Sequence, residues 1–295
     1  MASSELAMVL DMLRTGGLFG GSLLEMRARW NEQAAGTPDA PGVRAEGVNA
    51  DGVAATWFHP ESPEEGAIVY LHGGGYVLGS IATHRLLMGG LAVAARRSVL
   101  GVDYRLAPEH PHPAAVDDAE TVYRWLLGRG VDPATVVVAG DSAGGGLTVA
   151  TLLRLREGRH PLPAGGVCIS PWTDLTLSGD TMVTKAAVDP LVTREILEMG
   201  ARAYVAAGDA KAPTISPLFA DLRGLPPLLV QVGTEEMLLD DAKRLADAGT
   251  RAGVDVSLEV WDDMFHVWHA FALLLPEGQR AIDRIGAWVR ARTGA

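Results

Sequence analysis

Short apolar runs alternate with longer helical patterns along most of this chain of 295 residues. Runs rich in Val, Ile and Leu predict strands near residues 43–49, 53–59, 67–72, 98–103, 135–140, 165–170, 227–232 and 256–261. Apolar residues at helical spacing predict helices near residues 84–96, 114–129, 143–157, 239–252 and 276–292. Because strand and helix signals take turns, the pattern predicts an α/β fold with a mostly parallel eight-stranded sheet flanked by helices.

Two segments, residues 1–40 and 173–222, do not fit this alternation, and we expect them to form a small helical cap. In the first segment, apolar residues recur at helical spacing at Leu6, Val9, Leu10 and Leu13, and again at Leu23, Met26 and Trp30. The main domain would then comprise residues 41–172 and 223–295. The alternative is that individual cap residues simply pack as core.

The composition limits the classes of protein and partner. With 48% hydrophobic residues the chain can bury a large core. The net charge is −11 and the sequence holds no basic stripe or lysine cluster, so nucleic acid is a poor candidate partner. Cys168 is the single cysteine, which excludes an intramolecular disulfide. The sequence has neither a signal-like start nor a stretch of transmembrane length, so we expect a cytoplasmic protein without stable membrane insertion.

A sharp turn from strand to helix is predicted around Ser142. Residues 138–146 read Val-Ala-Gly-Asp-Ser-Ala-Gly-Gly-Gly and follow a β-branched run. This is a G-x-S-x-G pattern, in which side chains at Gly140 and Gly144 would collide with the backbone while the serine is held up as a nucleophile. A lone pattern of this kind is a weak match, but a helical pattern follows it. A glycine-rich turn that merely contains a serine is therefore the weaker interpretation.

A glycine loop follows an earlier predicted strand. The run 67–71 ends in His72-Gly73-Gly74-Gly75-Tyr76, which resembles the oxyanion-hole loop of lipases and esterases. Consecutive glycines let backbone N–H groups approach a ligand oxygen. By the usual geometry of that loop the donors are Gly74 and Gly75, together with the N–H of Ala143. Nucleotide binding is disfavoured, because neither phosphate-loop pattern is present.

Three motifs in order give the chain a specific resemblance. Besides residues 72–75 and 140–145, the segment 103–111 reads Asp-Tyr-Arg-Leu-Ala-Pro-Glu-His-Pro. The chain resembles the bacterial hormone-sensitive-lipase family, family IV of the esterases in the α/β-hydrolase superfamily. The resemblance spans nearly the whole chain. It implies an α/β-hydrolase catalytic domain, with the cap over the mouth of the active site.

The fold requires a base late in the chain, after the serine and an acid. His266 is the leading candidate, because it follows the predicted strand 256–261, where family members place the catalytic histidine. His269 is the rival. Of the other histidines, two belong to the motifs and orient backbone, whereas four are interpreted as surface or loop residues: His59, His84, His112 and His160.

Four carboxylates compete for the role of acid: Glu235, Glu236, Asp240 and Asp241. The family usually carries Asp-Pro-Leu-x-Asp in this loop, and aligning residues 238–240 with its Leu-x-Asp places Glu236 at the acid's position. We therefore predict a Ser142–His266–Glu236 triad, since a glutamate can serve as the acid. Asp189-Pro190-Leu191 also matches part of the pattern, but it precedes the penultimate strand and is interpreted as a turn.

The candidate substrate-binding residues are mostly large and apolar: Phe19, Met26, Trp30, Tyr76, Val77, Leu78, Trp172, Ile215, Leu218, Val267 and Trp268, with Asp141 beside the serine. Such a lining suits an apolar acyl or alcohol group. We expect a carboxylesterase for short- to medium-chain esters that works through an acyl-enzyme. Sugar esters and lactones remain open as substrates.

Two other functions are weighed against esterase activity. A non-catalytic small-molecule receptor on the same fold would lack the histidine, whereas His266 is retained. A serine peptidase or amidase is disfavoured because the oxyanion motif matches esterases. We expect no cofactor and no metal, since no metal-ligand motif is found. A small-molecule ester is the expected partner, and self-association as a homodimer is common among relatives.

Overall fold

The computed structural model describes residues 3–15 and 20–294. Its eight strands are β1 (Val43–Ala50), β2 (Val53–Pro60), β3 (Ala67–Leu71), β4 (Ser98–Val102), β5 (Val136–Asp141), β6 (Gly165–Ile169), β7 (Leu228–Gly233) and β8 (Val256–Trp261). They form one sheet in the order β1-β2-β4-β3-β5-β6-β7-β8. β2 pairs antiparallel with β1 and β4, and all other pairs are parallel. The mostly parallel eight-stranded sheet is thus confirmed.

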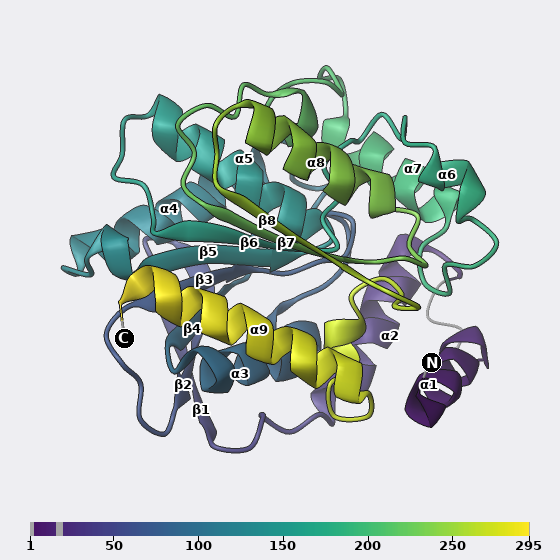
Figure 1. The fold of residues 1–295 in the computed structure, drawn as a ribbon, viewed down its shortest axis with the longest axis horizontal. Coiled ribbons are helices and arrows are strands. Elements are labelled where there is room, and N and C mark those ends of the chain that lie inside the picture. The colour runs from purple at the N-terminus through teal and green to yellow at the C-terminus, as the bar shows by residue number, and fades with distance from the viewer. Residues whose placement is uncertain (1–2, 16–19, 295) are drawn as a thin grey trace.

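Helices cover both faces of this sheet. α3 (Ile81–Ala95) and α9 (Pro276–Thr293) lie on one face, and α4 (Ala114–Gly128), α5 (Ala143–Glu157) and α8 (Leu239–Arg251) lie on the other (Figure 1). Every residue of β3 to β7 is buried. A parallel sheet needs such cover, because its connecting helices pack on both faces. This explains why the central strands read as continuous apolar runs.

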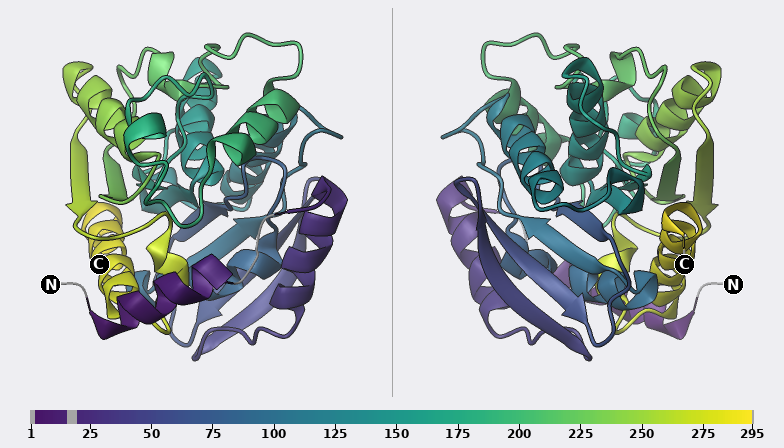
Figure 2. Two further views of the ribbon diagram at one scale, coloured as in Figure 1. Left: turned by 90° about the vertical axis from the view of Figure 1, so that its right-hand side faces the viewer. Right: turned by 90° about the vertical axis from the view of Figure 1, so that its left-hand side faces the viewer.

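The remaining helices gather at one end of the sheet, at the right of Figure 1. They are α1 (Ser4–Thr15), α2 (Leu23–Ala35), α6 (Thr181–Thr184) and α7 (Arg194–Val205). α2 begins with a capping box between Ser22 and Glu25. The apolar face of α1, which includes Leu6 and Val9, packs in a small cluster with Phe265. Figure 2 shows α1 beside the C-terminal part of the chain and α2 on the opposite side of the same end.

Short 3₁₀ turns complete the fold at η1 (Pro133–Thr135), η2 (Pro217–Phe219) and η3 (Trp268–Phe271). Among the described helices, none has the length and apolar character to cross a membrane.

Candidate active site

Ser142 lies at the turn where β5 passes into α5. Its φ of 54° is a conformation that residues other than glycine keep only where the surrounding structure enforces it. Its backbone N–H donates to the Ile169 carbonyl at 2.8 Å. A Cβ atom at Gly140 or Gly144 would collide with the carbonyl oxygen of Leu71. The two glycines are therefore needed for the close approach of β3 to this turn.

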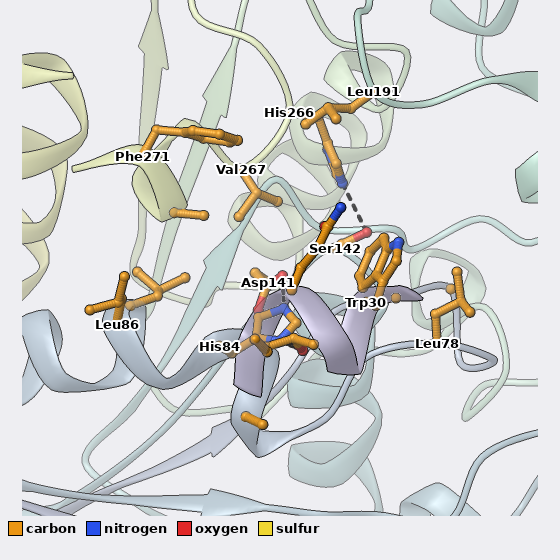
Figure 3. A pocket seen from close by; sticks show the side chains of 18 of the residues that line it. Trp30, Leu78, His84, Leu86, Asp141, Ser142, Leu191, His266, Val267 and Phe271 are labelled. Atoms are coloured by element: carbon orange, nitrogen blue, oxygen red, sulfur yellow. Dashed lines mark hydrogen bonds and ion pairs between the residues drawn. The ribbon is translucent and has the colours of Figure 1, made fainter. Parts of the chain in front are cut away.

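His266 lies directly in front of Ser142. It stands in the loop between β8 and η3 and is 6% exposed. Its Nε2 atom is 2.9 Å from Ser142 Oγ, and Figure 3 marks this hydrogen bond. The next residue, Val267, donates its backbone N–H to Ser170 Oγ at 3.1 Å. This second contact fixes the loop that carries the imidazole.

Glu236 is hydrogen-bonded to the other ring nitrogen of His266. His266 Nδ1 donates to Glu236 Oε2 at 2.9 Å. The second carboxylate oxygen accepts from Ser170 Oγ and from the Gly233 N–H, both at 2.7 Å. Because an ionised carboxylate only accepts, Nδ1 carries the proton and Nε2 is left to accept the proton of Ser142.

Burial and charge act in opposite directions on this pair. Burial lowers the pKa of His266, but the hydrogen bond and the negative charge of Glu236 outweigh it, so this pKa lies above its ordinary value. Burial raises the pKa of Glu236. The hydrogen bonds from His266, Gly233 and Ser170 act in the opposite direction but are outweighed, so this pKa lies above its ordinary value. The arrangement thus favours an imidazolium beside the carboxylate, which is the species formed when the imidazole takes a proton.

The other carboxylates of this loop are engaged elsewhere. Glu235 forms an ion pair with Lys185 at 3.1 Å. Asp240 accepts a backbone N–H at the start of α6. Asp241 lies buried against the loop after β6, and burial raises its pKa to about 7. Within residues 3–15 and 20–294, acidic, histidine and cysteine side chains form no cluster suited to a metal ion.

His269, the rival base, points away from Ser142. Its Nε2 atom lies 2.7 Å from Gln231 Oε1. Burial lowers the pKa of His269 to about 3, so it stays neutral and bound within the core.

The glycine loop after β3 borders the same cavity as Ser142. Gly74 and Gly75 both line it and have φ values of 118° and 62°. A Cβ atom at Gly74 would collide with the Leu78 carbonyl. Ala143 is the first residue of α5, and the first N–H groups of a helix have no partner within it. Two glycines of this loop therefore line the same cavity as the serine, and the first residue of α5 follows the serine directly.

The segment 103–111 supports the glycine loop. Tyr104 donates its hydroxyl to the His72 carbonyl at 2.6 Å, and the two rings stack with centroids 4.3 Å apart. The Ala107 N–H donates to the Tyr76 carbonyl at 2.9 Å. His72 Nδ1 lies 2.8 Å from the Gly73 carbonyl, so this histidine does orient backbone.

Asp141 and His84 form a buried ion pair beside the serine. The sequence interpretation of His84 as a surface or loop residue is wrong, because its turn of α3 faces inward and its side chain is 10% exposed. His84 Nε2 lies 3.3 Å from Asp141 Oδ2 (Figure 3). Asp141 Oδ1 accepts from the Tyr70 hydroxyl at 2.7 Å and from the Gly73 N–H at 3.1 Å. Although burial disfavours both charges, their attraction raises the pKa of His84 and lowers the pKa of Asp141.

A cavity of about 330 Å³ opens in front of Ser142. Four of the candidate substrate-binding residues line it: Trp30, Leu78, Asp141 and Val267. Further apolar lining comes from α3, from the segment before and within α7, and from η3, at Leu86, Leu87, Leu191, Val192, Ile196, Leu197, Ala270 and Phe271. Polar side chains at Gln33, Thr37, Thr83 and Arg85 also border the cavity. The wall is thus mainly apolar with a polar edge.

Other candidate substrate-binding residues lie in the core, outside this lining: Met26, Tyr76, Val77, Trp172, Ile215 and Leu218. Tyr76 illustrates the reason, since its ring stacks on Tyr204 with centroids 3.7 Å apart and so faces α7. Trp268 packs in the cluster formed with α1. Phe19 lies outside the described residues.

Comparison with known proteins places this geometry in a family. Residues 68–270 match a family model described as an alpha/beta hydrolase fold. The chain is 44% identical to an acetyl-hydrolase of Streptomyces hygroscopicus over 295 residues, which are 100% of this chain and 99% of that protein. It is 38% identical over 252 residues to an esterase of Acinetobacter venetianus, covering 84% of this chain and 82% of the relative.

A solved structure has the same fold as this chain. It is the crystal structure of an esterase from the bacterial hormone-sensitive lipase family, with a TM-score of 0.96 and 47% identity over the whole of both chains. The chain belongs to the bacterial hormone-sensitive-lipase family. The resemblance carried by the three motifs is thereby confirmed, and with it the α/β-hydrolase fold and the enzyme class of the carboxylic ester hydrolases.

Sequence reasoning missed two parts of the site in this member of the hormone-sensitive-lipase family. His84 was missed because the expected helix began at residue 84, whereas α3 begins at Ile81 after a capping box between Ser80 and Thr83. With the helix placed correctly, His84 falls one turn inside its start. The wall segment at residues 191–197 carried no signal beyond its apolar content.

Proposed function

We propose that the chain hydrolyses short- to medium-chain carboxylic esters through Ser142, His266 and Glu236, with an acyl-enzyme intermediate. The observation that carries this proposal is the continuous relay of two 2.9 Å hydrogen bonds from the serine to the carboxylate, beside an apolar cavity. Nucleophile, base and orienting acid in this order are what acyl transfer to serine requires.

The proposed reaction begins when Ser142 Oγ attacks the ester carbonyl carbon. His266 Nε2 takes the hydroxyl proton, and Glu236 stabilises the resulting imidazolium. The tetrahedral intermediate collapses as His266 returns the proton to the departing alcohol, which leaves the acyl group on Ser142. Water then attacks the acyl-enzyme, with His266 again acting as base, and releases the acid.

The oxyanion of the intermediate is proposed to accept hydrogen bonds from the backbone N–H groups of Gly74, Gly75 and Ala143. Their support is the position of both glycines and Ser142 on one cavity and the place of Ala143 at the start of α5. Fixed backbone donors aimed at developing charge commonly supply a large part of catalysis by this class of enzyme.

We also propose the division into a cap, residues 1–40 and 173–222, and a catalytic domain, residues 41–172 and 223–295. In support, Trp30 of α2 and Leu191 border the cavity from outside the sheet and its covering helices. The cytoplasmic location and the homodimer stay predictions from the sequence.

The activity is tested by measuring kcat/KM for p-nitrophenyl esters from acetyl to hexadecanoyl. We expect an optimum between acetyl and hexanoyl, because a cavity of about 330 Å³ leaves little room for a long acyl chain. Faster hydrolysis of dodecanoyl than of butanoyl ester would contradict the size argument. A protein that binds apolar ligands but hydrolyses no ester would favour the receptor, and cleavage of aminoacyl amides alone would favour the peptidase.

The pH dependence of kcat/KM gives a second test. His266 serves as the base only when it is neutral, and its pKa lies above the usual 6.5. We therefore expect kcat/KM to fall as the pH decreases through a midpoint above 6.5. The measurement uses p-nitrophenyl butyrate at constant buffer concentration and constant ionic strength. A profile that stays flat down to pH 5 would exclude His266 as the base.

A further inference from the structure

Asp189 connects two parts of the site that are far apart in the sequence. It lies between α6 and α7 and is 9% exposed. Its Oδ1 atom accepts the N–H groups of Leu191 at 3.0 Å and Val192 at 2.9 Å. Its Oδ2 atom accepts the N–H of Met237 at 2.8 Å. The first two donors belong to residues of the cavity wall, and the third follows Glu236 directly.

We propose that Asp189 is a positioning residue that anchors the cavity wall and the loop carrying Glu236 to one buried carboxylate. The proposal rests on the function proposed above. It assigns to Asp189 no contact with substrate. Instead, this carboxylate fixes the position of residues 191–192 of the cavity wall relative to Glu236, which orients His266.

The role requires a carboxylate because three backbone donors converge on its two oxygens. An amide at this position offers one acceptor oxygen, and its NH₂ group would face either the Met237 N–H or the pair from Leu191 and Val192. One side of the connection would then be lost, and a buried N–H would be left without its partner. Asp189→Asn therefore changes the connection while keeping the size of the side chain.

Neighbouring contacts between the same two segments provide matched controls. Lys185 and Glu235 form an ion pair at 3.1 Å, with about a quarter and a third of their side chains exposed. This pair joins the segment before Asp189 to the residue before Glu236, and neither member lines the cavity. Lys185→Met therefore removes a neighbouring connection and leaves the three N–H contacts of Asp189 in place.

The charge of Asp189 gives the proposal a separate readout. The carboxylates whose charges act on His266 come from three elements: Glu236 after β7, Asp189 before α7 and Asp141 at the end of β5. All three favour the imidazolium, whereas neighbouring His269 is neutral at ordinary pH. Removing one negative charge lowers the pKa of His266, so the acid limb of kcat/KM moves to lower pH. This shift reports the charge of Asp189, whereas a change in the KM of hexanoate relative to that of acetate reports its hold on the cavity wall.

The experiment compares wild type, Asp189→Asn, Asp189→Glu and Lys185→Met on p-nitrophenyl acetate and hexanoate. For Asp189→Asn we expect kcat to fall about tenfold through misplacement of the acid, KM for hexanoate to rise more than KM for acetate, and the acid limb to shift downward. For Asp189→Glu, which keeps the charge on a longer side chain, we expect the higher hexanoate KM with the acid limb unmoved. Lys185→Met should stay within about twofold of wild type in both constants.

The proposal is overturned if Asp189→Asn and Asp189→Glu lower the melting temperature but leave kcat and both KM values unchanged, whether or not the acid limb moves. Should Asp189→Asn not fold, the hexanoate KM of Asp189→Glu decides: a rise supports the anchor, and no change overturns it. Failure of the proposed function looks different, because wild type itself would then hydrolyse neither ester or Ser142→Ala would retain full activity.

Discussion

Replacing Ser142 with alanine is expected to lower kcat for p-nitrophenyl butyrate by a factor on the order of 10⁶, the scale seen when a serine nucleophile is removed from such a relay. The physical reason is the loss of the hydroxyl oxygen that lies 2.9 Å from His266 Nε2. KM should change little, because the apolar wall remains. The measurement is steady-state kinetics on freshly purified protein, with circular dichroism to verify that the variant is folded.

Ser62→Ala is the matched control, because Ser62 is exposed in the turn between β2 and β3. It should retain wild-type kcat. If Ser142→Ala keeps more than a few per cent of wild-type activity in the same preparation, the ester is cleaved elsewhere and Ser142 is not the nucleophile.

Replacing Glu236 with glutamine is expected to lower kcat by about 10⁴-fold, the loss known for an amide in place of the triad acid. The carboxylate fixes the imidazole tautomer through the 2.9 Å hydrogen bond to Nδ1. An amide can instead donate to Nδ1, which places the proton on Nε2, where it cannot accept from Ser142. The acid limb of any residual activity should also move to lower pH, because the charge that raises the pKa of His266 is gone.

Glu235→Gln is the control for this prediction. It alters the adjacent carboxylate, which pairs with Lys185 rather than with His266, and should stay within a few-fold of wild type. Glu236→Asp keeps the charge and should retain more activity than Glu236→Gln. A Glu236→Gln variant as active as Glu235→Gln would show that another group orients the imidazole.

The fold was predictable from the sequence because its signals are local. The central strands are covered on both faces and therefore appear as short apolar runs, so their predicted limits agree with the structure to within a residue or so. The start of α3 was misplaced because it depends on the side-chain exchange between Ser80 and Thr83, which hydrophobic periodicity does not reveal.

The grouping of Ser142, His266 and Glu236 was also accessible from sequence. Each side chain follows a strand of the parallel part of the sheet, so the carboxyl ends of β5, β7 and β8 bring them to the same edge. Glu236 was singled out by its register with Leu238 and Asp240, and the structure places it alone among the four carboxylates against the imidazole.

The cavity lining was much less accessible. Large apolar residues beside a motif have the same pattern whether they face a cavity or the core. Tyr76 and Trp172 face the core because α7 packs over them, whereas Leu86 and Phe271 border the cavity. Which outcome applies depends on how distant segments pack, and a single sequence holds no local signal for that.

Asp141 fixes part of the site before the substrate binds. The carboxylate precedes Ser142 on β5 and accepts the Gly73 N–H at the start of the glycine loop. Ser142 and the glycine loop are thus held at a fixed spacing by one buried group before any ester binds. Such pre-organisation spares the reacting groups from rearranging during the reaction. Discrimination between esters of different shape therefore falls to α2 and to residues 191–197, which line the cavity but belong to neither the serine turn nor the glycine loop.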